Sequence, residues 1–396
     1  MQRFRVFGKK SVVLIGSLCC VLCASGATHA LSVEQSASNV RTVQPQRRSS
    51  NVPNSQSAST SEIAEAPRTS VDPSGVDPVT GIPYYEEIRE DWSSLSVGAS
   101  ELHTEPPLVT LPDEAGTFTR TLVSLKWRPG DALDVYVILP KGVKNPPAVL
   151  YLYNYTDDTD RFKNDGWCRR VTGGGFAAIG FVSALSGHRF HDRPMKQWFV
   201  SELQESLGST VHDVKFILDY LASRGDIDMN RIGMFGQGSG ATIALLAAAA
   251  DSRIIAVDAL DPWGDWPVWL AKSAVGADDP ERTERLKPAF LKQVAPLDPV
   301  QWLPKVHAPY IRIQQNLEDQ ATPRVCKNRI RAAAPKRVVF ERFDTTAAFM
   351  NGEGGGRLFD WIKDAVAKPI VQPALRNTTV ASGSSARTST KRPVHQ

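Results

Sequence analysis

The sequence predicts an α/β protein with a mostly parallel central sheet, covered by helices on both faces and preceded by antiparallel strands. Strand-like and helix-like segments alternate between residues 148 and 366, which is typical of a parallel sheet. The alternating run Leu133–Leu139 follows a Pro-Gly turn and indicates an antiparallel hairpin at the edge of the sheet. The segment Arg231–Ala250 consists of a short apolar strand, a glycine-rich turn and an alanine-rich helix. α/β proteins place a nucleophile or a phosphate at such turns.

The individual elements follow from hydrophobic periodicity and from runs of β-branched and aromatic residues. One long helix is expected over Ser201–Arg224, because its apolar residues from Val211 to Leu221 recur at helical spacing. A Trp-rich and Pro-rich excursion, Pro262–Pro309, interrupts the alternation. The other expected helices are Ser239–Ala250, Pro323–Ala334 and Gly356–Val366. The expected strands are Phe118–Trp127, Asp134–Leu139, Ala148–Tyr153, Phe176–Val182, Ile232–Phe235, Ile254–Leu260, Tyr310–Gln314 and Arg337–Phe343.

Composition divides the 396 residues into four parts. Residues 1–30 carry basic residues, an apolar run and a small-residue end, which predicts a cleaved signal peptide and an exported (periplasmic or secreted) protein. The apolar run is too short to span a bilayer, although an uncleaved anchor is the alternative. Residues 31–81 and 371–396 are polar and are predicted to be a disordered linker and a disordered basic tail. Residues 82–370 are predicted to form one globular domain.

Charge and cysteine content exclude some classes of partner. Four of the 46 basic residues and none of the 42 acidic residues lie in residues 1–30, so the remaining chain is balanced. This balance gives little reason to expect a nucleic-acid partner, and no membrane span is expected after signal cleavage. Cys168 and Cys326 either pair or remain two buried thiols. No His/Cys cluster is present, so neither a metal nor another cofactor is expected.

Three stretches together resemble the α/β-hydrolase family, in particular its secreted esterase and prolyl-oligopeptidase-like branch. They are Asp213–Asp228, Asn230–Gly240 and Asn316–Pro323, and the resemblance covers about 230 residues, from Asp134 to Lys368. It implies a G-x-S-x-G nucleophile elbow, an acid after a later strand and a histidine after the last strand. That chemistry needs a hydroxyl, a base that takes its proton and a carboxylate that orients the base.

Carried over residue by residue, the resemblance implies a degenerate triad. Gly236 and Gly240 match the small flanks of the elbow, but Gly238 stands where the serine is expected. Asp319 matches the acid, and Ala347, in the predicted loop Asp344–Phe349 after the last strand, matches the histidine. The possible oxyanion donors are the backbone N–H of Ser239 and the loop at Asn154 and Tyr155.

Several interpretations of this region remain open. Ser239 is either the N-cap or the first residue of a helix, or a displaced nucleophile with His188 or His191 as its base. Trp263 and Trp266 either line a pocket or pack the excursion onto the sheet. The same glycines also fit a dinucleotide fingerprint, Gly236-x-Gly238-x-x-Ala241, with Asp258 as the ribose-binding acid.

The favoured hypothesis is an exported, non-catalytic relative of these hydrolases that binds a small-molecule or protein ligand through the former pocket. One alternative is an active serine hydrolase, an esterase or a peptidase, that uses displaced groups such as Ser239. The second alternative is the dinucleotide-binding protein.

Overall fold

The computed structural model describes residues 106–128, 131–154, 159–184, 202–275, 277, 282–354 and 356–368. The predicted signal peptide, linker and basic tail lie outside these ranges, and so do Tyr155, His188 and His191. Within the described ranges, no helix has the length and apolar character needed to cross a membrane.

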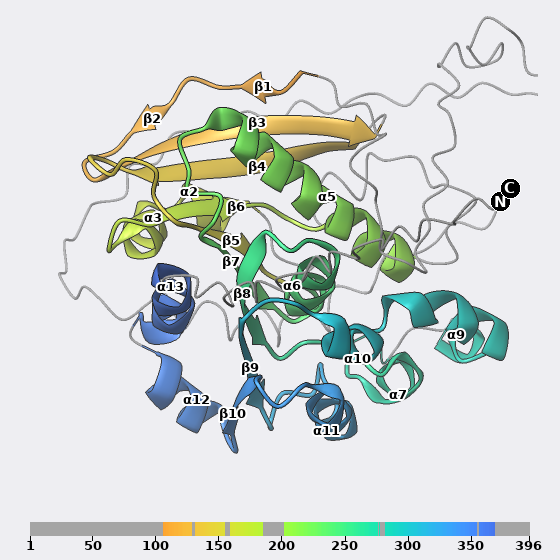
Figure 1. The fold of residues 1–396 in the computed structure, drawn as a ribbon. Coiled ribbons are helices and arrows are strands. Elements are labelled where there is room, and N and C mark those ends of the chain that lie inside the picture. Colours follow the sequence, from red (N-terminus) through yellow and green to blue (C-terminus); the bar gives the residue numbers. More distant parts are fainter. Residues whose placement is uncertain are drawn as a thin grey trace, which may run out of the picture.

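The centre of the molecule is one sheet of ten described strands in the order β1-β3-β4-β6-β5-β7-β8-β9-β10, with β2 also paired to β3 (Figure 1). The strands from β5 to β10 pair in parallel, whereas β4 is antiparallel to both β3 and β6. Their bounds are β1 Leu108–Val109, β2 Asp113–Glu114, β3 Phe118–Arg128, β4 Asp131–Pro140, β5 Ala148–Leu152, β6 Ala177–Gly180, β7 Ile232–Gln237, β8 Ile254–Leu260, β9 Tyr310–Asn316 and β10 Val339–Phe343.

Helices cover both faces of this sheet. One face packs against α5, α6 and the helices between β8 and β10, and the other packs against α2, α3, α12 and α13. The helix bounds are α2 Asp160–Lys163, α3 Asp165–Thr172, α5 Glu202–Arg224, α6 Ser239–Ala250, α7 Trp266–Lys272, α8 Arg282–Arg285, α9 Pro288–Val294, α10 Pro299–Trp302, α11 Arg324–Ala333, α12 Thr346–Glu353 and α13 Asp360–Ala367. Short 3-10 turns lie at η1 Ala295–Leu297, η2 Leu303–Lys305 and η3 Arg357–Phe359.

The predicted fold class is confirmed, and its physical basis is the buried centre of the sheet. Every residue of β5, β6 and β8 is buried, which suits strands covered on both faces. In α6, every residue from Ser239 to Ala248 is buried, because α6 lies between the sheet and α5. Its small alanine side chains allow this close approach.

Three details differ from the sequence predictions or complete them. The hairpin β3–β4 is antiparallel as predicted, but β1 and β2 lie outside it, so the hairpin is not the sheet edge. The segment after β10, predicted to be a loop, begins α12. Cys168 and Cys326 are buried and free in the structure, so they do not pair, and burial raises the pKa of the Cys326 thiol to about 12.

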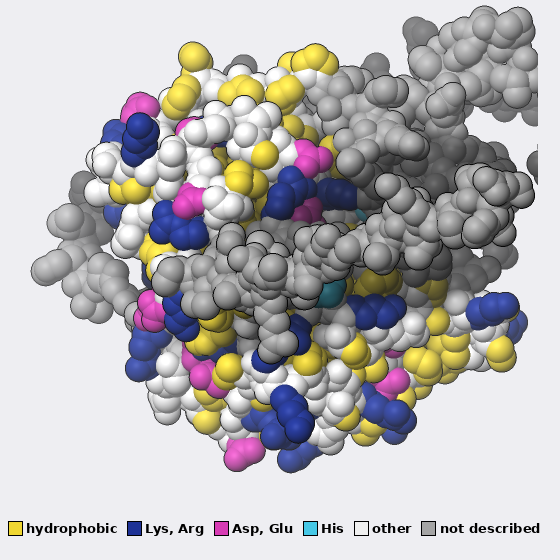
Figure 2. Space-filling view, in the orientation of Figure 1, with side chains coloured by type: hydrophobic (Ala, Val, Ile, Leu, Met, Phe, Trp, Pro, Cys, Tyr) yellow, Lys and Arg dark blue, Asp and Glu magenta, His cyan; other side chains and the backbone are white. Residues whose placement is uncertain are grey.

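Lys and Arg side chains lie at many places on the face that Figure 2 shows. Several of them lie over β10 and α11, in the lower part of the view.

Candidate functional site

The turn between β7 and α6 has the backbone shape of a nucleophile elbow. Gly238, at its apex, has φ +57° and ψ −117°, a conformation that side-chain-bearing residues adopt only with strain. Gly236 and Gly240 allow the turn to close: a Cβ on Gly236 would lie 2.3 Å from the carbonyl oxygen of Gly240. A Cβ on Gly240 would lie 2.2 Å from the carbonyl oxygen of Leu152. Gly236 and Gly240 are therefore required by the turn itself, and Gly238 avoids strain at its apex.

Asn154, just after β5, fills the space in front of the apex. A Cβ on Gly238 would lie 2.8 Å from Asn154 Oδ1. The same oxygen accepts hydrogen bonds from the Ser239 N–H (3.3 Å) and from the Ser239 hydroxyl (3.1 Å). Because a backbone N–H only donates, the atom facing it has to be the amide oxygen. An oxyanion stabilised by this elbow would occupy that acceptor's place.

Ser239 is the first residue of α6, and Gly238 is its N-cap. The side chain is buried and its hydroxyl donates to Asn154 rather than capping the helix. Asn154 thus contacts the elbow through its side-chain oxygen, which accepts hydrogen bonds, although the sequence predicted that its loop would supply a backbone donor.

The two tryptophans predicted near the pocket lie differently. Trp263 reaches the elbow: its Nε1 is 3.5 Å from the position of a Cβ on Gly238, and Thr242 in α6 holds its backbone through hydrogen bonds of 2.8 and 2.9 Å. Trp266 is 1% exposed and packs edge-on against Trp269, with ring centroids 5.7 Å apart. Packing of the excursion onto the sheet therefore accounts for Trp266.

Asp319, at the predicted acid position, lies in the loop after β9 and is held by its own loop. Its carboxylate accepts from the N–H groups of Ala321 (3.2 Å) and Thr322 (3.0 Å). The ammonium of Lys327, 1% exposed, lies 3.5 Å from this carboxylate. The acid position is therefore part of a structural hydrogen-bond network.

Lys327 is the centre of that network. Its Nζ donates to the carbonyl oxygens of Asn316 (2.6 Å) and Asp319 (2.8 Å), and lies 3.6 Å from the carboxylate of Asp261 at the end of β8. Burial, together with the nearby charge of Asp319, raises the pKa of the Asp261 carboxyl to about 8. One buried ammonium thus joins the loops after β8 and β9.

Ala347, at the predicted histidine position, lies exposed in the first turn of α12. This turn adjoins the acid loop, because the Thr346 N–H donates to Glu318 (2.7 Å) and the Thr346 hydroxyl accepts from the Asn316 amide (3.0 Å). The fold therefore brings the acid and histidine positions to neighbouring loops, and a methyl group occupies the position of the base.

The position of Asp258, the expected ribose-binding acid, contradicts the dinucleotide interpretation. Asp258 lies inside β8 with no exposed surface, and was expected at the end of the strand. Its carboxylate accepts from Arg312 through Nε (3.0 Å) and Nη2 (2.7 Å), and from Gln314 (3.0 Å). A carboxylate engaged in this way cannot bind ribose hydroxyls. The sequence signal that could have warned of this is the arginine in the next strand.

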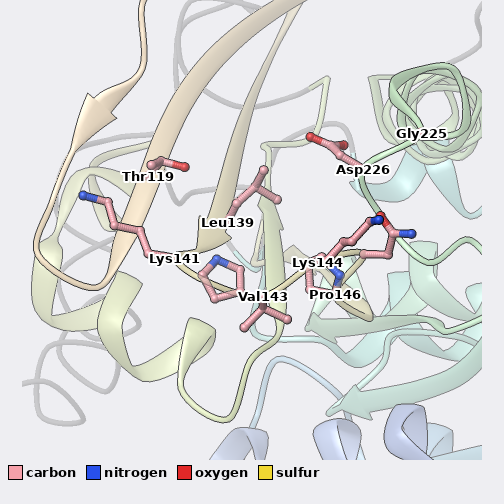
Figure 3. A pocket seen from close by; sticks show the side chains of 10 residues that line it. Thr119, Leu139, Lys141, Val143, Lys144, Pro146, Gly225 and Asp226 are labelled. Atoms are coloured by element: carbon pink, nitrogen blue, oxygen red, sulfur yellow. The ribbon is translucent and has the colours of Figure 1, made fainter.

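A cavity of about 520 Å³ in the described part of the chain lies near the start of the parallel strands, at the opposite end of these strands from the elbow (Figure 3). It adjoins the start of β5, whereas the elbow follows the end of the parallel strand β7. Its lining residues are Thr119, Leu139, Pro140, Lys141, Val143, Lys144, Asn145, Pro146, Gly225 and Asp226. The elbow residues do not contribute to it.

Sequence reasoning missed the acceptor role of the Asn154 side chain and the buried Lys327. Asn154 stands 85 residues before Ser239, so only the register of β5 beside β7 brings them together. For Lys327 a weak signal exists, since it occupies the inward-facing stripe of α11 with Cys326 and Ile330.

Comparison with known proteins supports the fold more than any activity. No family model matches the sequence. The chain is 28% identical over 139 residues to YtaP, a proposed hydrolase of Bacillus subtilis; the match covers 30% of this chain and 44% of YtaP, less than half of that relative.

Two solved structures share the fold. An acetyl xylan esterase from Thermoanaerobacterium has a TM-score of 0.53 and 13% identity, covering 66% of this chain and 89% of that chain. An acetyl xylan esterase from Paenibacillus has a TM-score of 0.51 and 15% identity, covering 69% of this chain and 90% of that chain. At such low identities the likeness concerns the fold alone.

Proposed function

Because the chain has the α/β-hydrolase fold, we propose that it is a non-catalytic member of that fold that binds a ligand at the elbow edge of the sheet. The proposal rests above all on one observation: the elbow has a glycine at its apex, and an internal amide oxygen lies where a nucleophile would extend. A serine hydrolase needs a hydroxyl at this apex.

The hydrogen bonds at the elbow also support the proposal. The Ser239 N–H, which would stabilise the oxyanion of an acyl-transfer reaction, already donates to Asn154 Oδ1. Loss of such a donor costs hydrolases about 10²–10³ in kcat. An acylated substrate would have to displace Asn154 before the donor could act.

The two other triad positions point the same way. Ala347 cannot accept a proton, and the Asp319 carboxylate is hydrogen-bonded within its own loop. Without a base to orient, this carboxylate has a structural role, which Lys327 supports.

Labelling with a fluorophosphonate probe tests whether the protein is catalytic. The active-hydrolase alternative is favoured by one observation, the Ser239 hydroxyl at the elbow. We expect no labelling of the wild-type protein and no hydrolysis of p-nitrophenyl acetate above the rate of the Ser239→Ala variant. Labelling or hydrolysis that Ser239→Ala abolishes would show a displaced nucleophile and contradict the proposal.

A binding measurement tests the ligand. The two similar structures are named as acetyl xylan esterases, so we propose an acylated saccharide as ligand and acetylated xylo-oligosaccharides as first probes. Calorimetric titration of the wild-type protein is expected to give saturable binding without release of acetate. The Trp263→Ala variant, which removes the indole at the elbow, is expected to bind more weakly.

We further propose that the protein is exported. The support is the sequence of residues 1–30. Expression of the full chain in a bacterial host, followed by fractionation and intact-mass measurement, is expected to find a shortened chain in the periplasm or the medium. A full-length chain in the cytoplasm would contradict export.

A further inference from the structure

The strand β10 forms one end of the described sheet. It pairs in parallel with β9 on one side and stands last in the strand order. Its burial differs from that of the interior strands: Val339 is 46% exposed and the four residues after it are half-buried. A strand of this kind presents a row of backbone donors and acceptors to a further strand.

The region around this edge is strongly basic, although the charges of residues 31–396 as a whole balance. Residues 320–343 contain seven Lys and Arg residues and a single acid, Glu341. Glu341 does not neutralise the surface, because it accepts from the buried Arg312 (2.9 Å). The exposed or half-buried cations are Arg324, Arg329, Arg331, Lys336, Arg337 and Arg342.

These cations have few charged partners. Arg329 lies 3.8 Å from Asp265, a long ion pair. Within the described part of the chain, the other five lie beyond salt-bridge distance of any carboxylate. Arg337 instead donates to the backbone carbonyls of Val306 and Ala308, which leaves its charge uncompensated.

Two of the arginines are held along the seam between α11 and β10. Arg342 Nη2 donates to Asn328 Oδ1 (3.1 Å), and the Arg331 guanidinium lies 5.8 Å from the centre of the Phe340 ring. Arg324 lies one turn before Asn328 on the same exposed stripe of α11. The stripe therefore runs beside the sheet edge, where Figure 2 shows the basic side chains over β10 and α11.

We propose that this edge binds an extended acidic peptide segment by strand addition. The backbone of the segment pairs with the outer edge of β10, and its carboxylates meet the arginines of the seam. Strand addition supplies affinity through main-chain hydrogen bonds, and side-chain contacts supply specificity. Arginine suits this role, because its planar guanidinium binds carboxylates in pairs of hydrogen bonds.

The cations also explain why β10 would select an acidic segment over other strands. Like charges repel, so the same arginines oppose pairing of β10 with β10 of a second copy. An acidic strand is attracted, whereas neutral and basic strands gain nothing from the seam. This inference is independent of the elbow and of the ligand proposed for it.

Fluorescence anisotropy with labelled peptides of about ten residues, a length sufficient for one strand, tests the proposal. The probes are an alternating Glu-Val peptide, a Lys-Val peptide of the same pattern, and a Glu-Pro peptide with N-methylated glutamates, which carries the same charge but has no internal backbone N–H to donate to the ladder. We expect only the Glu-Val peptide to bind. Its binding is expected to weaken at 0.5 M salt, where the Debye length is about 4 Å and charges farther apart than that are screened. Amide hydrogen exchange in Val339–Phe343 is expected to slow when it binds.

The Arg324→Ser/Arg331→Ser double variant is expected to bind the Glu-Val peptide about tenfold more weakly, as the loss of two partly exposed charge contacts implies. The matched control, Lys141→Ser/Lys144→Ser, removes two cations from the loop between β4 and β5, several strands away from β10, and is expected to bind as the wild type does. Equal binding of the Glu-Pro peptide would overturn strand addition. Equal weakening by the control pair, or displacement of the peptide by a lower concentration of an acidic oligosaccharide, would overturn the peptide proposal.

Discussion

Replacement of Gly238 by serine restores the residue that the elbow lacks, and its cost follows from the structure. A side-chain-bearing residue at φ +57° and ψ −117° costs about 1–3 kcal/mol. The new Cβ, 2.8 Å from Asn154 Oδ1, forces the amide to move and weakens two hydrogen bonds worth about 0.5–1.5 kcal/mol each. The free energy of unfolding is expected to fall by the sum of these terms, about 2–6 kcal/mol. For a domain of this size, at about 2 °C per kcal/mol, that lowers Tm by about 4–12 °C.

Differential scanning calorimetry measures the stability, and a p-nitrophenyl acetate assay measures the activity. The Gly238→Ser variant is expected to fold and to remain inactive, because Ala347 cannot accept the serine proton. The Gly238→Ser/Asn154→Ala double variant removes the obstructing amide. Relative to Asn154→Ala, its free energy of unfolding is expected to fall only by the backbone strain, about 1–3 kcal/mol.

Two outcomes would refute this reasoning. Hydrolysis by Gly238→Ser, with fluorophosphonate labelling at the new serine, would mean that a base lies within reach of the apex. A Tm equal to that of the wild type would mean that the apex neither strains a side chain nor contacts Asn154.

Three further substitutions, the first of them with a control variant, test the elbow and the loops near it. Gly240→Ala places a Cβ 2.2 Å from the Leu152 carbonyl oxygen and is expected to prevent native folding, as measured by circular dichroism. In the control variant Gly116→Ala the new Cβ meets no atom within 4 Å, and Tm is expected to stay within about 2 °C of the wild-type value. Lys327→Met is expected to cost about 3–5 kcal/mol in chemical denaturation, because it removes the buried ammonium from the Asp319 carboxylate and from two carbonyl oxygens; a loss below about 1 kcal/mol would contradict the network. Asp261 has a folded-state pKa of about 8 against an ordinary value of 3.8, so the folded state binds its proton more tightly and its contribution favours folding at low pH. Asp261→Asn is therefore expected to gain stability relative to the wild type as pH rises from about 4 to 8, and equal pH profiles would contradict the raised pKa.

The strands and long helices could be predicted because their apolar patterns are local. The predicted bounds of α6 and β8 agree with the structure, since a glycine turn and a charged loop delimit them. The helix α12 was missed because Thr345 and the residues after it lack an apolar period. Its start depends instead on the Thr345 side chain, which accepts from the Ala348 N–H (3.0 Å).

The sequence predicted only those parts of the candidate site whose residues lie close together in the sequence. The elbow follows from the three glycines, which lie within five residues of one another. Asn154, Lys327 and Asp258 owe their roles to partners in other strands or loops, and strand register is not visible in one sequence. A buried carboxylate within a strand resembles a strand-end carboxylate until its arginine is placed beside it.

The contact between Asn154 and Ser239 has a thermodynamic consequence for any ligand. An acceptor tethered inside a site acts as an intramolecular competitor with a high effective concentration. The measured affinity is then the intrinsic affinity reduced by the fraction of molecules in which the tethered oxygen has moved aside. Removal of that oxygen by Asn154→Ala should tighten the binding of every ligand that offers an acceptor to the elbow. The wild-type dissociation constant thus reports an exchange between two acceptors, one of which never leaves the protein.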